Sequence, residues 1–290
     1  MKKLTLLALG MIFTPITMAA LNPAQPLSEV PPISIFQEWA KPIAPFKIAP
    51  QVWYVGTKNL TSILLTTEDG HILIDAGLNE SALQIKENIE NIGFDVKDIK
   101  YILNSHARLD QAGGIALLKE LSGAKVVSNK INAQQLKLGG AEDFALGDAL
   151  LFPSVNTDIE LLDNESFILG NIIVTALFTP GHLPGSTSWK VTFKNDDVLI
   201  YADSLATPDY FLKNNLNYPK IVEDLKYSQN ILANQKVDIF IASKGDRFNL
   251  EDKLNKLNNG DKNAFYDSEG LKEYVEKSKS SLMKQLNQSL

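Results

Sequence analysis

The segment His-Ala-Arg-Leu-Asp-Gln at residues 106–111 constrains this chain more than any other part of its sequence. It follows the apolar run Tyr101–Leu103, which predicts a short buried strand, and precedes Ala112–Leu121, which predicts a helix. A strand that enters a turn before a helix places the side chains of the turn at one edge of a sheet. His106 and Asp110 carry imidazole and carboxylate groups, which bind divalent metals. The segment therefore has the outline of a metal-binding turn.

The rest of the chain alternates runs that predict strands with runs that predict helices. Strands are expected at 52–56, 62–66, 71–75, 125–127, 160–162, 172–178, 186–193, 198–201 and 237–242, and helices at 81–92, 130–138, 220–233, 250–258 and 268–286. This order predicts an α/β fold with two mixed sheets, each covered by helices on its outer face. Residues 21–50 are Pro-rich and predict an extended arm packed on the body. No internal linker or short-period repeat is found, so residues 21–290 are expected to form a single domain.

Residues 1–20 have the features of a cleaved secretory signal peptide. Two lysines precede an apolar run from Leu4 to Ile16, and small residues follow at Ala19 and Ala20. The run is shorter than the roughly 20 residues that span a bilayer, and Pro15 interrupts it. A periplasmic or secreted protein without a membrane anchor is therefore expected.

Composition limits the chemistry and the partners of the chain. No cysteine is present, so no disulfide forms and no thiolate serves as nucleophile or ligand. Any metal would depend on His, Asp, backbone oxygen or water. A formal net charge of −6 gives no electrostatic reason to expect nucleic acid as a partner. The hydrophobic content of 44% suffices for one large core.

Five further segments, in order, support a family resemblance. They are Ile72–Gly77, Gly139–Phe144, Thr179–Trp189, Tyr201–Leu205 and Phe240–Lys244. Together with residues 106–111 they resemble the third subclass of metallo-β-lactamases, whose dizinc site usually has five histidines and one aspartate. The family motif His-x-His-x-Asp-His reads here His-x-Arg-x-Asp-Gln. The resemblance implies the αββα sandwich of the metallo-β-lactamase fold, and an atypical branch in which Arg, Gln and Lys replace three histidine ligands.

Three residues remain from the family's ligand set. His106 and His182 are two of only three histidines in the chain, and both fall on motif positions. Asp110 matches the aspartate that binds the second zinc and orients water; an alternative role is the N-cap of the following helix. The hypothesis is that these three bind one zinc, with water in the fourth place. Asp203 is a candidate fourth ligand, and a second zinc is expected to be weak or completed by substrate.

The three replacements change what each position can do. Arg108 stays protonated, so it has no lone pair for a metal. Gln111 falls on a second-zinc position but offers only a weakly ligating amide oxygen, and Lys244 would have to lose its proton to bind zinc. One hypothesis is that Lys244 or Arg108 holds the substrate carboxylate, or the anion formed on ring opening. The alternative is that both face solvent or pair with Asp110 and Asp203.

Four other residues are assigned two alternative roles each, and one is assigned none. Ser204 corresponds to the family serine that bonds site water, or is a loop hydroxyl. Trp53, Phe144 and Tyr210 line the substrate cleft, or only pack in the core. His71 is the last residue of the segment 68–71, which resembles a hairpin turn, and is assigned no function.

The resemblance implies a zinc-dependent enzyme that hydrolyses β-lactam antibiotics, namely penicillins, cephalosporins and carbapenems. Metal-bound hydroxide would attack the lactam carbonyl, and the protein would be a periplasmic monomer that confers antibiotic resistance. Two alternatives remain open. One is a periplasmic metallo-hydrolase of another ester or lactone. The other is an inactive protein of the same fold that binds an anion between Arg108 and Lys244.

Overall fold

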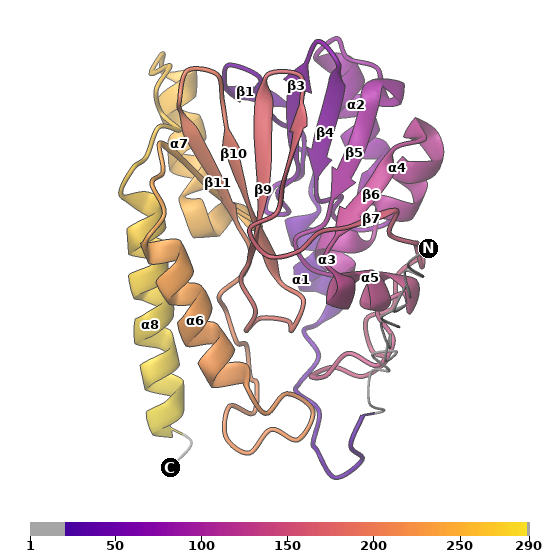
Figure 1. Ribbon diagram of the computed structural model, residues 1–290, viewed down its shortest axis with the longest axis vertical. Helices are drawn as coiled ribbons and strands as arrows, with labels where there is room; N and C mark the ends of the chain where they lie inside the picture. Colours follow the sequence, from indigo (N-terminus) through magenta and orange to yellow (C-terminus); the bar gives the residue numbers. More distant parts are fainter. Residues whose placement is uncertain (1–20, 289–290) are drawn as a thin grey trace, which may run out of the picture.

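Two β-sheets pack face to face, with helices on both outer faces (Figure 1). The computed structural model describes residues 21–288, so the predicted signal peptide lies outside the described residues. The layers confirm the expected αββα sandwich of two mixed sheets.

The first sheet has seven strands in sequence order, from β1 to β7. β1 to β4 form an antiparallel meander, whereas β4 to β7 run parallel. Parallel neighbours need long crossover connections, and helices provide them here. The strands are β1 Phe46–Ala49, β2 Val52–Tyr54, β3 Ile63–Thr67, β4 Gly70–Ile74, β5 Ile99–Leu103, β6 Lys125–Ser128 and β7 Ile159–Glu160.

The second sheet has five strands in the order β12-β11-β10-β9-β8. Only β11 and β12 pair in parallel, and the other neighbours are antiparallel. Its strands are β8 Ser166–Leu169, β9 Ile172–Phe178, β10 Thr187–Thr192, β11 Val198–Ala202 and β12 Ile239–Ala242.

Helices cover the outer faces and fill the connections. α2 and α4 lie over the first sheet, and α6 and α8 lie over the second (Figure 1). The α-helices are α1 Ile33–Trp39, α2 Ser81–Asn91, α3 Leu109–Ala112, α4 Ile115–Ser122, α5 Lys130–Lys137, α6 Ile221–Ala233, α7 Leu250–Asn258 and α8 Gly270–Gln288, and the 3-10 helices are η1 Val96–Asp98 and η2 Gly245–Phe248.

The central strands of the first sheet are apolar on both faces because both faces are covered. Leu64 of β3 and Leu73 of β4 pack into the layer with α2 and α4. Their neighbours Leu65 and Ile72 point the other way, into the layer between the sheets. Side chains alternate across a strand, so a strand buried on both sides reads as a continuous apolar run.

Several local predictions were wrong. Residues 21–50 are not wholly extended, because they contain the helix α1, and β1 is a strand of the first sheet rather than part of an arm. β8 was not predicted, and His71 lies buried within β4 rather than in the turn before it. The expected helix 112–121 is divided into α3 and α4 at Gly113 and Gly114.

Gly114 lies at this division in close contact with the loop after β4. A β-carbon at Gly114 would lie 2.3 Å from the backbone oxygen of Ala76, so the motif segment packs directly on the loop after β4. Glycine is the residue that permits such a close approach of two backbones.

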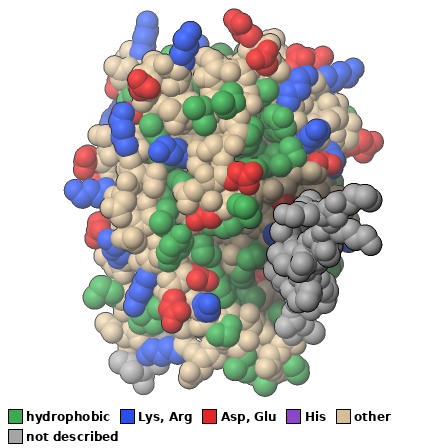
Figure 2. Space-filling view, viewed as in Figure 1, with side chains coloured by type: hydrophobic (Ala, Val, Ile, Leu, Met, Phe, Trp, Pro, Cys, Tyr) green, Lys and Arg blue, Asp and Glu red, His purple; other side chains and the backbone are tan. Residues whose placement is uncertain are grey.

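The visible surface carries interspersed acidic and basic side chains without a large block of one sign (Figure 2). In the described part of the chain, no helix combines the length and the apolar character needed to cross a membrane.

Candidate active site

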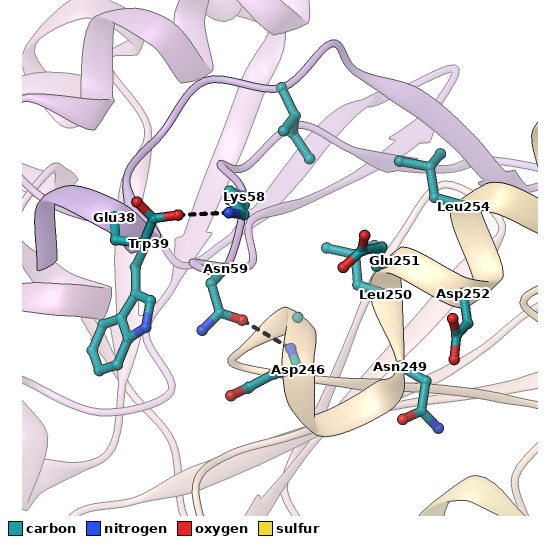
Figure 3. A pocket seen from close by; sticks show the side chains of 12 residues that line it. Glu38, Trp39, Lys58, Asn59, Asp246, Asn249, Leu250, Glu251, Asp252 and Leu254 are labelled. Atoms are coloured by element: carbon teal, nitrogen blue, oxygen red, sulfur yellow. Dashed lines mark hydrogen bonds and ion pairs between the residues drawn. The ribbon is translucent and has the colours of Figure 1, made fainter. Parts of the chain in front are cut away.

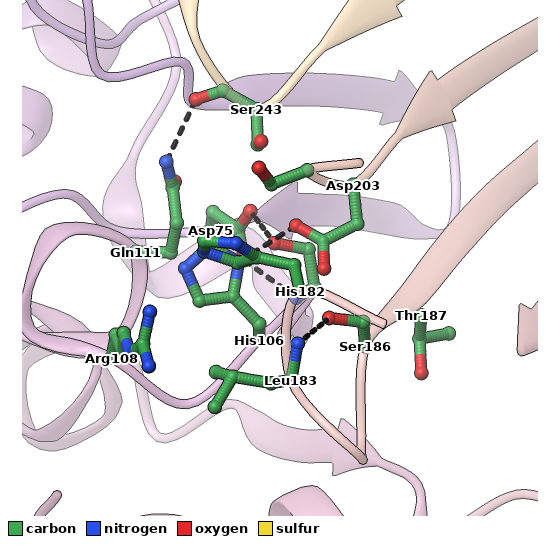
Figure 4. Close-up of polar contacts among 12 residues, drawn as sticks. Asp75, His106, Arg108, Gln111, His182, Leu183, Ser186, Thr187, Asp203 and Ser243 are labelled. Carbon is green, nitrogen blue, oxygen red and sulfur yellow. Dashed lines mark hydrogen bonds and ion pairs between the residues drawn. The ribbon is translucent and has the colours of Figure 1, made fainter. Parts of the chain in front are cut away.

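Four strands end at the same edge of the sandwich and deliver the motif residues there. β5 leads to His106, β9 to His182, β11 to Asp203 and β12 to Lys244. Figure 4 shows that the side chains of His106, His182 and Asp203 converge from these loops. The structure therefore brings His106, His182 and Asp203 together, with Lys244 at the same edge.

His106 is fully buried between two aspartates. Its Nδ1 lies 2.7 Å from Oδ1 of Asp203, and its Nε2 lies 3.5 Å from Oδ1 of Asp110. Burial favours the neutral ring, but the two carboxylates outweigh it and raise the pKa of His106 to about 10. The carboxylate of Asp203 fixes the ring orientation, as in the carboxylate–histidine pairs that support metal ligands.

His182 is held by a backbone oxygen instead. Its Nδ1 lies 2.7 Å from the carbonyl oxygen of Ala206, so Nδ1 carries the proton and Nε2 has the lone pair. Burial, together with the positive charges of His106 and Arg108, lowers the pKa of His182 to about 3. The ring is therefore neutral, and its centroid lies 4.9 Å from that of His106.

Asp110 forms a buried ion pair with Lys244. Nζ of Lys244 donates to Oδ2 of Asp110 at 2.5 Å, and the same Nζ lies 3.8 Å from the ring centroid of Trp39. Burial alone would raise the pKa of Asp110, but Lys244 and His106 hold it well below its usual range. Asp110 lies in the first turn of α3, whose N-cap is Arg108, so the N-cap alternative for Asp110 is wrong.

Arg108 pairs with Asp143 and Tyr210. Its guanidinium makes two hydrogen bonds to the carboxylate of Asp143, at 2.6 and 2.8 Å, and a third to the hydroxyl of Tyr210. Of the two pairings considered as an alternative for the cations, Lys244 with Asp110 is present, whereas Arg108 pairs with Asp143.

The other candidates divide between the cleft and the core. Gln111 donates through Nε2 to the backbone oxygen of Ser243 at 2.7 Å. Ser204 lines the cleft, and its hydroxyl also accepts the backbone N–H of Ala206. Tyr210 lines the cleft, and Phe144 packs edge-on against it. Trp53 packs on Phe94 in the layer with α2 and α4, so only the packing role holds for Trp53.

Asp75 is a supporting residue to which sequence reasoning gave no role. Its fully buried carboxylate accepts hydrogen bonds from the backbone and hydroxyl of Ser105 and from the hydroxyl of Tyr201. Burial raises the pKa of Asp75 to about 7 against these donors. The available signal was the position of Asp75 directly after an apolar strand. A carboxylate there is expected to be buried, and a buried carboxylate needs hydrogen-bond partners.

The fit of a zinc ion depends on the nitrogens of two histidines. Among residues 21–288, no group of three or more His, Asp or Glu side chains has the arrangement of a metal site. Nε2 of His106 is nevertheless buried without a hydrogen-bond partner in this part of the chain. With both Nδ1 atoms committed to oxygens, Nε2 of His106 and Nε2 of His182 are the available donors. The residues fit a zinc ion held by two histidines, and the His106 proton must leave when it binds.

A cleft of about 480 Å³ opens beside Asp110 and His182. Its lining includes Asp110, His182, Ser204 and Lys244, and part of its wall comes from the N-terminal arm, residues 29–36. A second hollow of about 570 Å³ lies on the other side of Trp39 (Figure 3). It contains no residue of the 106–111 motif, so we place the active site in the first cleft.

Family and structural comparisons agree with this geometry. Residues 56–245 match the model of the metallo-β-lactamase superfamily. The chain belongs to this superfamily, and it is a hydrolase of the metallo-β-lactamase fold.

Three solved structures illustrate the similarity of this chain to metallo-β-lactamases. A metallo-β-lactamase of Cronobacter sakazakii, described by its HARLDQ motif, is 59% identical with a TM-score of 0.92, covering 93% of this chain and 98% of that one. The FEZ-1 metallo-β-lactamase of Legionella gormanii is 34% identical with a TM-score of 0.82, covering 86% and 97%. BJP-1, a subclass B3 metallo-β-lactamase of Bradyrhizobium japonicum, is 31% identical with a TM-score of 0.82, covering 87% and 97%.

Curated relatives are more distant. An N-acyl homoserine lactonase of a Bacillus species is 28% identical over 174 residues, which is 51% of this chain. The matched part spans 64% of that lactonase's length.

Proposed function

We propose that this protein is a zinc-dependent β-lactamase that acts in the periplasm. The observation that carries the proposal is the pair of anchored imidazoles, His106 and His182, beside the ionised Asp110. His182 and Asp110 line an open cleft, and His106 is fully buried next to them. The similarity to a HARLDQ-motif metallo-β-lactamase, which has the same six residues as this chain at 106–111, supports it.

Each residue of the site is assigned a separate role in the proposed hydrolysis. His106 and His182 would hold zinc, which supplies Lewis acidity toward a carbonyl oxygen and activates water for attack. Asp110 is ionised and can accept a hydrogen bond from the attacking water, which orients its lone pair. Lys244 offers further N–H donors beside its bond to Asp110, and these can bind the carboxylate next to the lactam ring. Cleavage of the C–N bond leaves a ring nitrogen that takes up a proton.

Hydrolysis as a function of zinc tests the proposal. The purified mature protein would be titrated from chelated to excess zinc while a penicillin, a cephalosporin and a carbapenem are assayed and bound zinc is measured. Turnover that rises and saturates near one zinc per chain is expected, because two histidine nitrogens are available. Saturation near two would mean that Gln111 or Lys244 also binds metal. No β-lactam turnover at any zinc level would contradict the proposal.

Lys244→Ala is expected to raise KM for anionic β-lactams roughly tenfold, because a charge-assisted hydrogen bond is worth about 1.5–3 kcal/mol. Lys58→Ala is a matched control, since Lys58 pairs with Glu38 beside the second hollow. Steady-state kinetics on both variants would check this. Unchanged KM and turnover in Lys244→Ala would show that Lys244 does not contact the substrate.

A second candidate is a lactonase, which the curated relatives favour. A lactone is a cyclic ester, and its hydrolysis needs the same attack on a carbonyl. Parallel assays with N-acyl homoserine lactones separate the candidates, because lactone turnover in the absence of β-lactam turnover would favour the second.

A further inference from the structure

Arg108 lines the cleft but is almost fully enclosed, and its hydrogen bonds are made to other protein side chains rather than left free for a ligand. Its side chain is 8% exposed, and that of Asp143 is 5% exposed. A guanidinium has five N–H donors, of which Nε and one on Nη2 bind Asp143 and one on Nη1 binds Tyr210. Its carbon Cζ also lies over the rings of Phe144 and Tyr210, at 5.9 and 5.5 Å.

Asp143 connects Arg108 to one wall of the cleft through its own hydrogen bonds. Its Oδ1 accepts the backbone N–H groups of Ala145 and Leu146, at 2.9 and 3.0 Å. Leu146 lines the cleft. The oxygen of Ala145 accepts the backbone N–H of Ser28 at 2.7 Å, which ties the N-terminal arm to this loop. Arg108 is therefore connected through Asp143 to the arm that covers the cleft.

Tyr210 connects Arg108 to a second segment of the cleft wall. Its ring stacks on His182, with centroids 5.9 Å apart and an angle of 25° between the planes. The segment around Tyr210 also lines the cleft, through Pro208 and Asp209. One guanidinium thus joins the motif turn to two loops that are distant in sequence.

We propose that Arg108, Asp143 and Tyr210 form a clamp that positions the walls of the cleft, so that Asp143 and Tyr210 are positioning residues and Arg108 is not a substrate-binding group. The clamp sets the placement of Leu146 and the N-terminal arm on one side, and of Tyr210 against His182 on the other. Its effect on hydrolysis rests on the proposed function, whereas its effect on the arm does not.

The clamp contains a buried ion pair, so it can be tested by replacing Arg108 and Asp143 with neutral residues of similar size. Removing one partner of a buried ion pair leaves the other charge desolvated, whereas replacing both is tolerated far better. Arg108→Gln and Asp143→Asn are each expected to lower Tm by roughly 10 °C, and the double variant is expected to recover more than half of that loss. Asn at 143 keeps an oxygen that can accept the N–H groups of Ala145 and Leu146.

Two further measurements distinguish positioning from general stability. Hydrogen exchange is expected to rise in residues 27–36 and 143–147 of either single variant under conditions where the sheets stay protected. KM for β-lactams is expected to rise about tenfold while kcat changes less than threefold, because the walls move and the reacting groups stay in place. Tyr210→Phe should give a smaller rise in KM, since it keeps the ring on His182.

A second ion pair provides the control. Nζ of Lys119 lies 2.7 Å from Oδ2 of Asp158, but both side chains are partly exposed and neither lines the cleft. Lys119→Gln with Asp158→Asn should leave exchange of the arm and KM unchanged.

The clamp and the proposed function can fail separately. If no β-lactam is hydrolysed, Tm and hydrogen exchange still decide on the clamp. If hydrolysis occurs but the effects of the two single variants on Tm simply add, or exchange in residues 27–36 and 143–147 stays at the wild-type level, the clamp is wrong. If a single variant does not fold, a folded double variant with Tm near wild type supports the coupling, and an unfolded double variant contradicts it.

Discussion

His106→Ala is expected to lower kcat/KM for β-lactam hydrolysis by roughly a thousandfold, within the range of about 10²–10⁴ that one positioned catalytic group contributes. The change removes the buried Nε2 that faces Asp110, and it leaves the carboxylate of Asp203 buried without its imidazole. Bound zinc should fall in parallel with activity. Steady-state kinetics and metal analysis on the same preparation would check both expectations.

His71→Leu is the matched control, because His71 is the third histidine and lies buried in β4, outside the active-site cleft. Neither of its ring nitrogens has a hydrogen-bond partner in the described residues, so an apolar replacement should fold and retain activity within about twofold. Zinc content that stays at the wild-type level in His106→Ala would refute ligation by His106.

Gly114→Ala is expected to destabilise the protein by about 3 kcal/mol, which corresponds to a fall in Tm of roughly 6–12 °C for a domain of this size. The added β-carbon would lie 2.3 Å from the backbone oxygen of Ala76 and 3.1 Å from that of Leu78. Backbone atoms on both sides cannot yield as a flexible side chain can, so the motif segment must shift away from the loop after β4. Thermal unfolding would measure the loss.

The control for Gly114 is Gly123, which ends α4 with φ +71° and has no atom within 4 Å of an added β-carbon. Gly123→Ala should cost only the strain of a left-handed backbone, about 1–2 kcal/mol. Equal losses in the two variants would show that the contact with Ala76 is not responsible.

Regular elements with strong periodicity were predictable from the sequence. β9 and α7 were predicted with their observed limits, because turn residues flank each element in the sequence. α1 was missed because it is only seven residues long and buries one side chain, Phe36, so its helical period is barely sampled. Its place in the fold depends on tertiary contacts such as the ring of Trp39 against Lys244.

The site was predictable in position but not in its pairings. His106, His182 and Lys244 converge as the motif segments indicated, because strand ends at one edge of a sandwich bring distant loops together. The partner of Arg108 was not predictable, since Asp143 lies 35 residues away in a loop and nothing local to either residue encodes the pair. The sequence offered only the segment that contains Asp143, without a role for its carboxylate.

The pairing of Arg108 with Asp143 has an evolutionary consequence. A substitution of histidine at position 108 would leave the Asp143 carboxylate without its bidentate partner, and a prior change at Asp143 would leave the guanidinium buried without its carboxylate. Either order of the two mutations is expected to pass through a less stable intermediate. Positions 108 and 143 are therefore expected to change together in relatives of this chain.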